Sequence, residues 1–244
     1  MTLSQKVTRM RFGFLVLLGA VLFASPQAKG QDFNYTVAIN TSTWSELSSQ
    51  TLCNSVNLSW ADSYIIPIGF MFPFNGNFYD TVRIETNGYL VFDANREHAF
   101  TAYNSFRQKL DSIGNYSVLS YELGGTIGNH IMKIQYKNVG QQQSPHEFLS
   151  YQIWLYENGH IDVITGPHSY SSNPNDPYSV PDTNQFVRTG MLNMYMTGTV
   201  FGYFVGQTAT GSGGQPANSA QPDPVYFNTI PESGTRFTFL PASN

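Results

Sequence analysis

Cysteine is almost absent from this chain, since Cys53 is the only one among 244 residues. No disulfide can therefore form within the chain, and the fold has to be held by a hydrophobic core rather than by cross-links. No histidine or lysine stands near Cys53 in the sequence to activate its thiol, so we interpret it as a small buried residue. A disulfide to a second chain is the alternative.

Charged residues are also scarce, at 11% of the chain, and the basic residues beyond residue 30 form no cluster. The formal charge is -4, and removal of residues 1–30 leaves eight basic and 16 acidic residues, a charge of -8. An acidic chain without a basic patch is unsuited to binding phosphate backbones. We therefore expect neither nucleic acid nor an anionic membrane surface as a partner.

Long apolar runs are missing as well. The run at residues 14–23 has ten residues, whereas a membrane-spanning helix needs about 20. Basic residues precede this run, and Ala28-Lys29-Gly30 supplies small residues after it, which is the pattern of a secretory signal peptide. We predict that residues 1–30 are a cleaved signal peptide and that no transmembrane segment remains. The protein is then exported: secreted, held at the cell surface, or periplasmic.

A sustained helical period is lacking too, and only residues 104–113 resemble a helical turn. Short strand-like runs recur instead, separated by turn residues, and we count about ten to twelve strands. Two packed antiparallel sheets accommodate this number. We therefore predict a single all-β domain over residues 31–244, a two-sheet antiparallel β-sandwich that is jelly-roll-like.

Two Asn-Gly pairs, Asn87-Gly88 and Asn158-Gly159, stand between alternating apolar runs. Asn-Gly favours a two-residue hairpin turn of type I′, in which both central residues have positive φ. In the first hairpin this turn places Ile84 opposite Val91. The face on which each hairpin side chain lies follows from this assignment.

The run at residues 66–74 alternates large apolar side chains with other residues, which predicts one buried face. The residues expected on that face are Ile66, Ile68, Phe70, Phe72 and Phe74. Pro67 and Pro73 lack the backbone donor of a central strand, so we place this strand at a sheet edge or beside a bulge. Residues 130–139 alternate in the same way and predict a half-exposed strand.

One segment, residues 206–224, is rich in Gly, Ser, Ala, Gln and Pro. Such a composition cannot bury enough apolar surface to offset the entropy lost on ordering. We predict a flexible loop there and further loops at residues 140–145 and 169–184.

A Phe-rich strand, a Tyr-led strand and an Asn-Gly hairpin ending in phenylalanine follow one another, and two further strands continue the pattern. The segments are residues 66–76, 79–84, 86–92, 132–139 and 151–159. Together they resemble the nidogen-like extracellular β-domains over residues 65–166. The resemblance implies an adhesive or matrix module without a shared catalytic motif. Related bacterial surface proteins often carry a C-terminal sorting tail; none follows Leu240, so secretion or periplasmic residence stays open.

The second hairpin carries a cluster of ionisable side chains, Glu157, His160 and Asp162. With a two-residue turn, Tyr156 faces Ile161, Glu157 lies opposite His160, and Asp162 shares their face. Paired carboxylates serve catalysis in glycoside hydrolases, so this trio is the candidate catalytic site. Charged residues beside a turn also serve solubility alone, and we expect a protein that is not an enzyme.

Hard oxygen ligands gather in one predicted loop, where Asp176 and Asp182 are candidates for binding calcium. The spacing is not that of a known calcium loop, and a stiff turn explains the same residues. His146-Glu147 lacks the second histidine of the H-E-x-x-H zinc motif. We expect no cofactor, with calcium as the alternative.

Aromatic residues make up 15% of the chain, and a disulfide-free core needs most of them. Four tyrosines in the less regular C-terminal half are candidates for ligand binding by stacking on sugar rings: Tyr170, Tyr178, Tyr195 and Tyr203.

Export without a catalytic motif favours one class of function. We predict a secreted or cell-surface, non-enzymatic binding or adhesion module that recognises a surface glycan or an extracellular protein. The alternatives are a secreted carbohydrate-active hydrolase, which would cleave glycans, and a structural envelope or matrix subunit, which would self-assemble.

Overall fold

The chain divides into two units, Met1–Asp32 and Phe33–Asn244. A computed structural model describes residues 35–53, 63–103, 117–140, 148–169, 189–194, 200–205, 217–219 and 230–241. All of these residues belong to the second unit.

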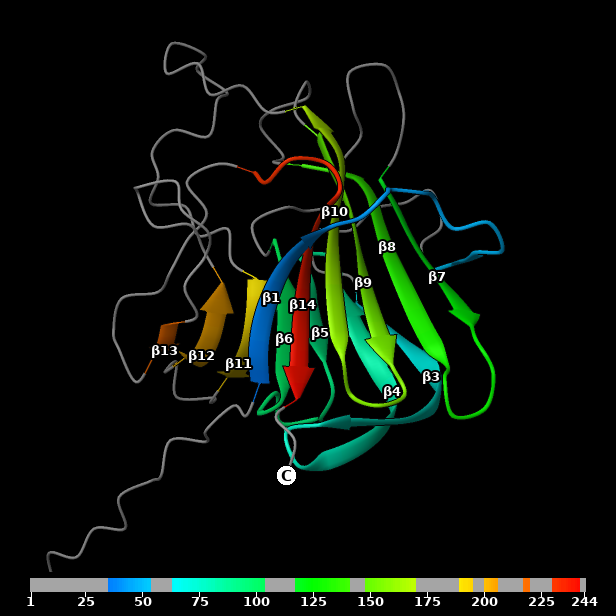
Figure 1. The fold of residues 1–244 in the computed structure, drawn as a ribbon. Helices are drawn as coiled ribbons and strands as arrows, with labels where there is room; N and C mark the ends of the chain where they lie inside the picture. The colour runs from blue at the N-terminus through cyan, green and yellow to red at the C-terminus, as the bar shows by residue number, and fades with distance from the viewer. Residues whose placement is uncertain are drawn as a thin grey trace, which may run out of the picture. The chain divides into compact units, whose positions relative to one another are not determined.

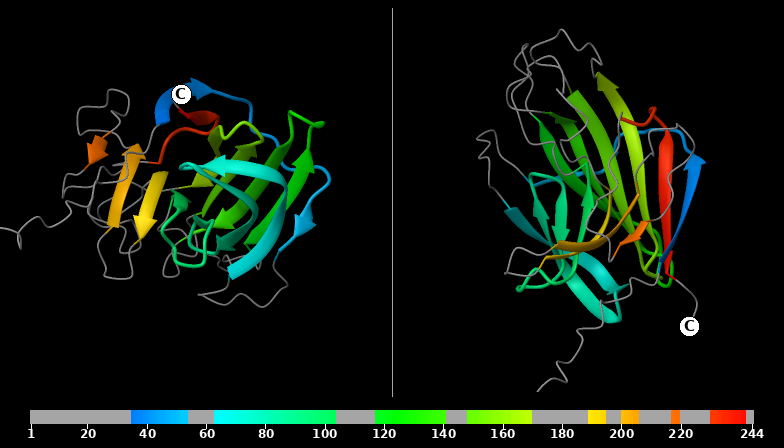
Figure 2. Two further views of the ribbon diagram at one scale, coloured as in Figure 1. Left: turned by 90° about the horizontal axis from the view of Figure 1, so that it is seen from below. Right: turned by 90° about the vertical axis from the view of Figure 1, so that its left-hand side faces the viewer.

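In the described residues, fourteen strands form two seven-stranded antiparallel sheets (Figures 1 and 2). The first sheet has the order β1 (Tyr35–Thr41), β14 (Thr235–Pro241), β10 (Ile161–Ser169), β9 (Phe148–Tyr156), β8 (Ile131–Val139), β7 (Val118–Gly124) and β2 (Thr51–Leu52). The second has the order β13 (Ala217–Ser219), β12 (Val200–Val205), β11 (Thr189–Met194), β6 (Ala99–Ala102), β5 (Tyr89–Val91), β4 (Asn77–Glu85) and β3 (Ser63–Phe74). Three strands have only two or three residues, which leaves eleven longer ones. The prediction of an all-β sandwich is confirmed.

Within each sheet most strands pair with their neighbours in the sequence. Strands β7 to β10 form one continuous meander and β3 to β6 form another. Strand β14 lies between β1 and β10, so the two ends of the unit pair with each other. The likeness to a jelly roll therefore concerns the two-layer architecture, whereas the connections are mainly simple hairpins.

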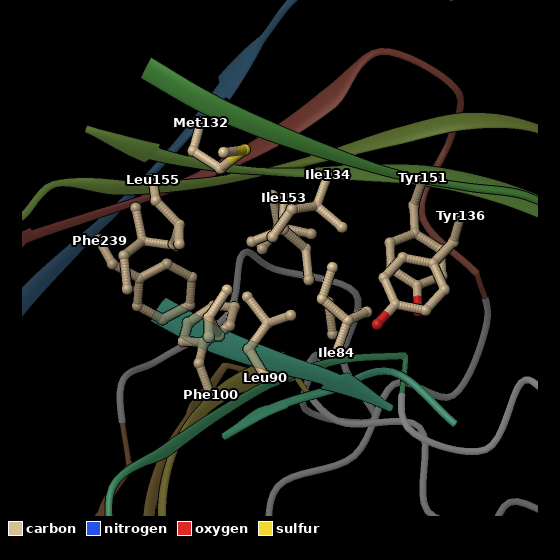
Figure 3. Close-up of a cluster of buried hydrophobic side chains, with 14 of the residues drawn as sticks. Ile84, Leu90, Phe100, Met132, Ile134, Tyr136, Tyr151, Ile153, Leu155 and Phe239 are labelled. Carbon is tan, nitrogen blue, oxygen red and sulfur yellow. The ribbon is translucent and has the colours of Figure 1, made fainter. Parts of the chain in front are cut away.

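Apolar side chains from the inner faces of both sheets form one core (Figure 3). Ile134 and Ile153 of the first sheet point toward Ile84 and Leu90 of the second, and all four are fully buried. Packed side chains of this kind, rather than cross-links, hold the two sheets together.

Strand β3 behaves as its sequence predicts. The five alternating apolar residues from Ile66 to Phe74 are all buried, at 9% exposure or less. The strand is the outermost of its sheet, and its register with β4 shifts between Pro67 and Phe72. Gly69, with φ of +87°, lies inside this shift. Edge position and bulge are both confirmed, and they are where proline is tolerated.

Both Asn-Gly hairpins differ from the predicted register by one residue. Ile84 faces Leu90 rather than Val91, because the loop holds three residues instead of two. In both hairpins the asparagine has a negative φ, and only Gly88 and Gly159 are left-handed, at 88° and 86°. A type I turn followed by a left-handed glycine needs just one residue with positive φ, and glycine supplies it. The type I′ prediction is wrong.

The connection from β1 to β2, residues 42–50, crosses the outer face of the first sheet (Figures 1 and 2); we call it the strap. Its Trp44 lies so close to Gly166 that a Cβ there would meet the indole at 2.7 Å. Its Leu47 is buried and donates its backbone N–H to Gln135 Oε1. For this reason Gln135 is completely buried on β8, where the alternating pattern predicts a half-exposed face.

Several predicted segments lie outside the described residues: the helical turn at 104–113, and the loops at 140–145 and 169–184 except for their first residues. Inside the predicted loop 206–224, residues 217–219 pair with β12 as β13. None of the described residues forms a helix long and apolar enough to span a membrane.

Candidate functional site

The register of the second hairpin decides which side chains face outward. Asp162 pairs with Trp154 across β9 and β10, and the two residues lie on the outer face of the first sheet. Leu155 and Ile161 face each other on the buried side. The predicted placement of Glu157 opposite His160 is therefore wrong, again because the loop holds three residues.

Asp162 is a carboxylate completely shielded from solvent, and four side chains donate hydrogen bonds to it. Tyr156 Oη donates to Oδ2 over 2.7 Å, and Thr238 Oγ1 donates to Oδ1 over 2.7 Å. His160 Nε2 lies 2.8 Å from Oδ1, and the guanidinium of Arg236 forms an ion pair with Oδ2. The carboxylate thus joins residues of β9, β10 and β14.

The balance of burial and hydrogen bonding sets the ionisation of Asp162. Burial alone would raise the pKa of this carboxyl group, but the bonds from His160, Arg236, Tyr156 and Thr238 outweigh burial and lower the pKa to about 2. Burial and the bond to Asp162 raise the pKa of the Tyr156 hydroxyl. At neutral pH the site therefore contains a carboxylate anion and a phenol that keeps its proton.

Three partly exposed rings lie beside this carboxylate. Tyr156 and His160 stack with their centroids 4.3 Å apart and their planes 12° from parallel. Trp154 lies 6.4 Å from Tyr156, and the ammonium of Lys133 lies over the indole, 4.7 Å from its centroid. We call the rings of Trp154, Tyr156 and His160, with Lys133 and Arg236, the ring platform.

The strap and two buried glutamines hold Trp154 in place. Trp154 Nε1 donates to Gln152 Oε1 over 2.9 Å. Gln152 Nε2 donates in turn to Gln135 Oε1 and to the backbone oxygen of Ser45, each over 2.8 Å. The indole is thus tied through Gln152 to both the sheet and the strap.

Glu157 belongs to a separate pair. Its carboxylate accepts hydrogen bonds from the backbone N–H of His130 and from His130 Nδ1, each over 2.9 Å. The His130 ring also stacks on Phe70, with centroids 5.9 Å apart. These bonds, the backbone one foremost, lower the pKa of Glu157. In the structure His160 is therefore hydrogen-bonded to Asp162, whereas Glu157 is hydrogen-bonded to His130.

The remaining candidates from the sequence are mostly outside the described residues. Those are Tyr170, Tyr178, Tyr195, Asp176 and Asp182. Tyr203 lies on β12, opposite Met191 of β11.

In the part of the chain that the structure describes, no three His, Cys, Asp or Glu side chains are grouped to hold a metal ion. Cys53 is a half-buried free thiol, and burial raises its pKa to about 12, which disfavours reactivity.

Sequence reasoning missed Lys133, Trp154, Tyr156 and Arg236. Trp154 and Tyr156 stand two residues apart on one strand, a spacing that places both rings on one face. The predicted two-residue turn placed these two rings opposite apolar residues of the next strand, whereas in the structure Trp154 lies opposite Asp162. No local signal points to Arg236, because it reaches Asp162 from 74 residues away.

Nearly the whole second unit is similar to one known protein family. The family model described as NIDO related matches residues 34–241, a span that includes every strand of both sheets. No curated protein and no solved structure matches the chain. The match extends the predicted resemblance well beyond residues 65–166. The chain therefore belongs to the NIDO-related (nidogen-related) family, which indicates an extracellular module of the binding type.

Proposed function

We propose that this chain is a non-enzymatic extracellular recognition module that binds a surface glycan or an extracellular protein on its ring platform. The observation that carries the proposal is the arrangement of Trp154, Tyr156 and His160, which are partly exposed and are each hydrogen-bonded. Aromatic rings that are apolar in the body and polar at one edge are typical of binding surfaces.

The platform is organised before any partner arrives. Binding usually costs about 0.5–1.5 kcal/mol for each flexible side chain that becomes fixed. The bonds of Tyr156 and His160 to Asp162, and of Trp154 to Gln152, hold these rings in the free protein. A partner that stacks on them therefore loses little free energy to ordering.

The contacts of Asp162 favour binding over hydrolysis. A glycoside hydrolase needs two carboxyl groups that face one substrate bond. Asp162 is shielded from solvent and bonded to four donors, and Glu157 is bonded to His130. Neither carboxylate is thus free to serve as acid or nucleophile at the platform.

Binding of the purified chain to an array of surface glycans and extracellular proteins tests the proposal. We expect Trp154→Ala to weaken binding at least tenfold. Phe78→Ala is the matched control, because Phe78 is 66% exposed on β4 of the other sheet and its loss should leave binding unchanged. Circular dichroism checks that both variants keep the fold.

Two results would contradict the proposal. Equal binding by the wild type and Trp154→Ala would remove the platform as the binding surface. Release of sugar from a bound glycan, abolished in Glu157→Gln, would restore the hydrolase alternative. Size-exclusion chromatography without ligand tests the remaining alternative, a structural envelope or matrix subunit, which ordered self-assembly would favour.

A further inference from the structure

Lys133 is a cation without an acidic partner among the described residues. The described part of the chain contains five basic side chains: Arg83, Arg96, Lys133, Lys137 and Arg236. Arg96, Lys137 and Arg236 form ion pairs there, whereas no described carboxylate lies within ion-pair distance of Lys133. Glu122 faces Lys133 across β7 and β8, but its carboxylate accepts the backbone N–H of Ser49 over 2.9 Å. The ammonium rests on the Trp154 ring instead.

Arg236 keeps donors available after its ion pair is made. Its bonds to Asp162 and to Tyr156 both use Nη2. Among the described residues Nη1 has no acceptor, and 29% of the side chain is exposed. A planar guanidinium with free N–H groups is suited to a carboxylate.

The two cations flank the rings. Lys133 lies on β8, Trp154 on β9, Asp162 on β10 and Arg236 on β14, which are consecutive strands of the first sheet. Lys133, Trp154, Asp162 and Thr238 pair in one row across these strands, and Arg236 lies two residues along β14 from that row. Three strand spacings of roughly 4.8 Å and two residues of roughly 3.4 Å along the strand therefore separate the backbones of Lys133 and Arg236, about 16 Å in a straight line. The charged groups reach inward from there, since the Lys133 ammonium lies over Trp154 and the Arg236 guanidinium reaches Asp162. Cations on both sides of three rings suit an oligosaccharide that stacks on those rings better than they suit a single sugar.

We propose that the ring platform binds an acidic oligosaccharide, one whose sugar rings carry carboxylate groups. The inference rests on the proposed function and specifies its ligand class. The rings supply stacking on the sugar faces, while Lys133 and Arg236 supply charge for the carboxylates. Because the whole chain is acidic, at -4, recognition depends on these local cations and not on attraction by the protein's overall field.

Matched pairs of oligosaccharides test the ligand class by titration calorimetry. Oligogalacturonate and oligomannuronate carry carboxylates where oligogalactose and oligomannose carry hydroxymethyl groups. We expect the full chain to bind at least one uronate at least tenfold more tightly than its neutral counterpart. The preference should shrink as the salt concentration rises from about 0.01 to about 0.15 M, where the screening length falls from about 30 to about 8 Å.

A pair of lysine variants tests the residue. Lys133→Gln should bring the uronate and its neutral counterpart to within about threefold of each other. Lys137→Gln is the matched control, because Lys137 lies on the same strand but pairs with Glu46 of the strap. It should leave the preference unchanged.

Three outcomes would overturn the inference. The first is equal binding of uronate and neutral sugar, and the second is an unchanged preference in Lys133→Gln. The third is no binding of either sugar. The array experiment tests the proposed function separately. If Trp154→Ala loses the binding of a ligand that the wild type binds on the array, the proposed function is supported even when uronates are not preferred.

Discussion

Asp162 holds a negative charge on the outer face of a sheet without any contact with solvent. Moving a carboxylate out of water is costly unless donors replace the lost hydration. Three hydrogen-bonding side chains and one guanidinium replace it, and most of them also form the ring platform. The carboxylate therefore holds these side chains in place, and its loss should affect both the stability of the fold and the geometry of the rings.

The pH dependence of stability follows from the lowered pKa of the Asp162 carboxyl group. The pKa of Asp162 is about 2 in the fold against an ordinary 3.8, so stabilisation is complete above about pH 4 and is lost as the pH falls toward 2. At pH 7 we expect Asp162→Asn to lower the free energy of unfolding by about 3 kcal/mol. The difference from the wild type should shrink by about 2 kcal/mol between pH 5 and pH 2, measured by urea unfolding.

A surface carboxylate provides the control for this prediction. Asp80 is exposed on β4, so Asp80→Asn should change the free energy of unfolding by less than about 0.5 kcal/mol. A difference between the wild type and Asp162→Asn that stays constant with pH would show that the charge of Asp162 is not what stabilises the fold.

At the scale of elements, the Asn-Gly hairpins depend on one residue each. Gly88 has φ of +88°, whereas Asn87 has a negative φ and a buried Oδ1 without a partner among the described residues. Gly88→Ala should therefore cost about 1–2 kcal/mol and Asn87→Ala less than about 0.5 kcal/mol. Thermal unfolding measures both, and equal losses would restore the type I′ turn.

The strap is a second element, and its position depends on the close contact between Trp44 and Gly166. A Cβ at Gly166 would meet Trp44 at 2.7 Å and the backbone oxygen of Ser150 at 2.8 Å. We expect Gly166→Ala to displace the strap and to cost about 1–3 kcal/mol in chemical unfolding. Gly124→Ala is the control, because no atom lies within 4 Å of its Cβ position. A loss no larger than that of the control would mean that the strap adapts freely.

At the scale of the whole unit, one core joins both sheets. Phe239 of the first sheet meets Phe100 of the second edge to face, with centroids 5.2 Å apart, and both rings are fully buried. Phe239→Ala should cost about 3–5 kcal/mol. Circular dichroism and tryptophan fluorescence should report the same unfolding midpoint, because neither sheet keeps its buried face alone.

The neighbouring residue supplies the control. Leu240 is 41% exposed on the same strand, so Leu240→Ala should cost less than about 1 kcal/mol. Two separate midpoints in Phe239→Ala would mean that the sheets unfold independently and that the core is not shared.

What the sequence by itself determines in this protein is local. The alternation along β3, the edge position required by Pro67 and Pro73, and the glycine of each hairpin depend on backbone chemistry and burial pattern. The family resemblance rests on the same strand and turn residues, and the match over residues 34–241 confirms it.

Only the tertiary structure decided which side chains meet. A shift of one residue exchanges the two faces of a hairpin, and that shift separated Glu157 from His160 and placed Trp154 beside Asp162. Gln135 is buried because the strap, distant in sequence, covers it, and Arg236 joins the platform because β14 pairs with β10. Such contacts result from long-range strand pairing, which the pattern of neighbouring residues does not encode.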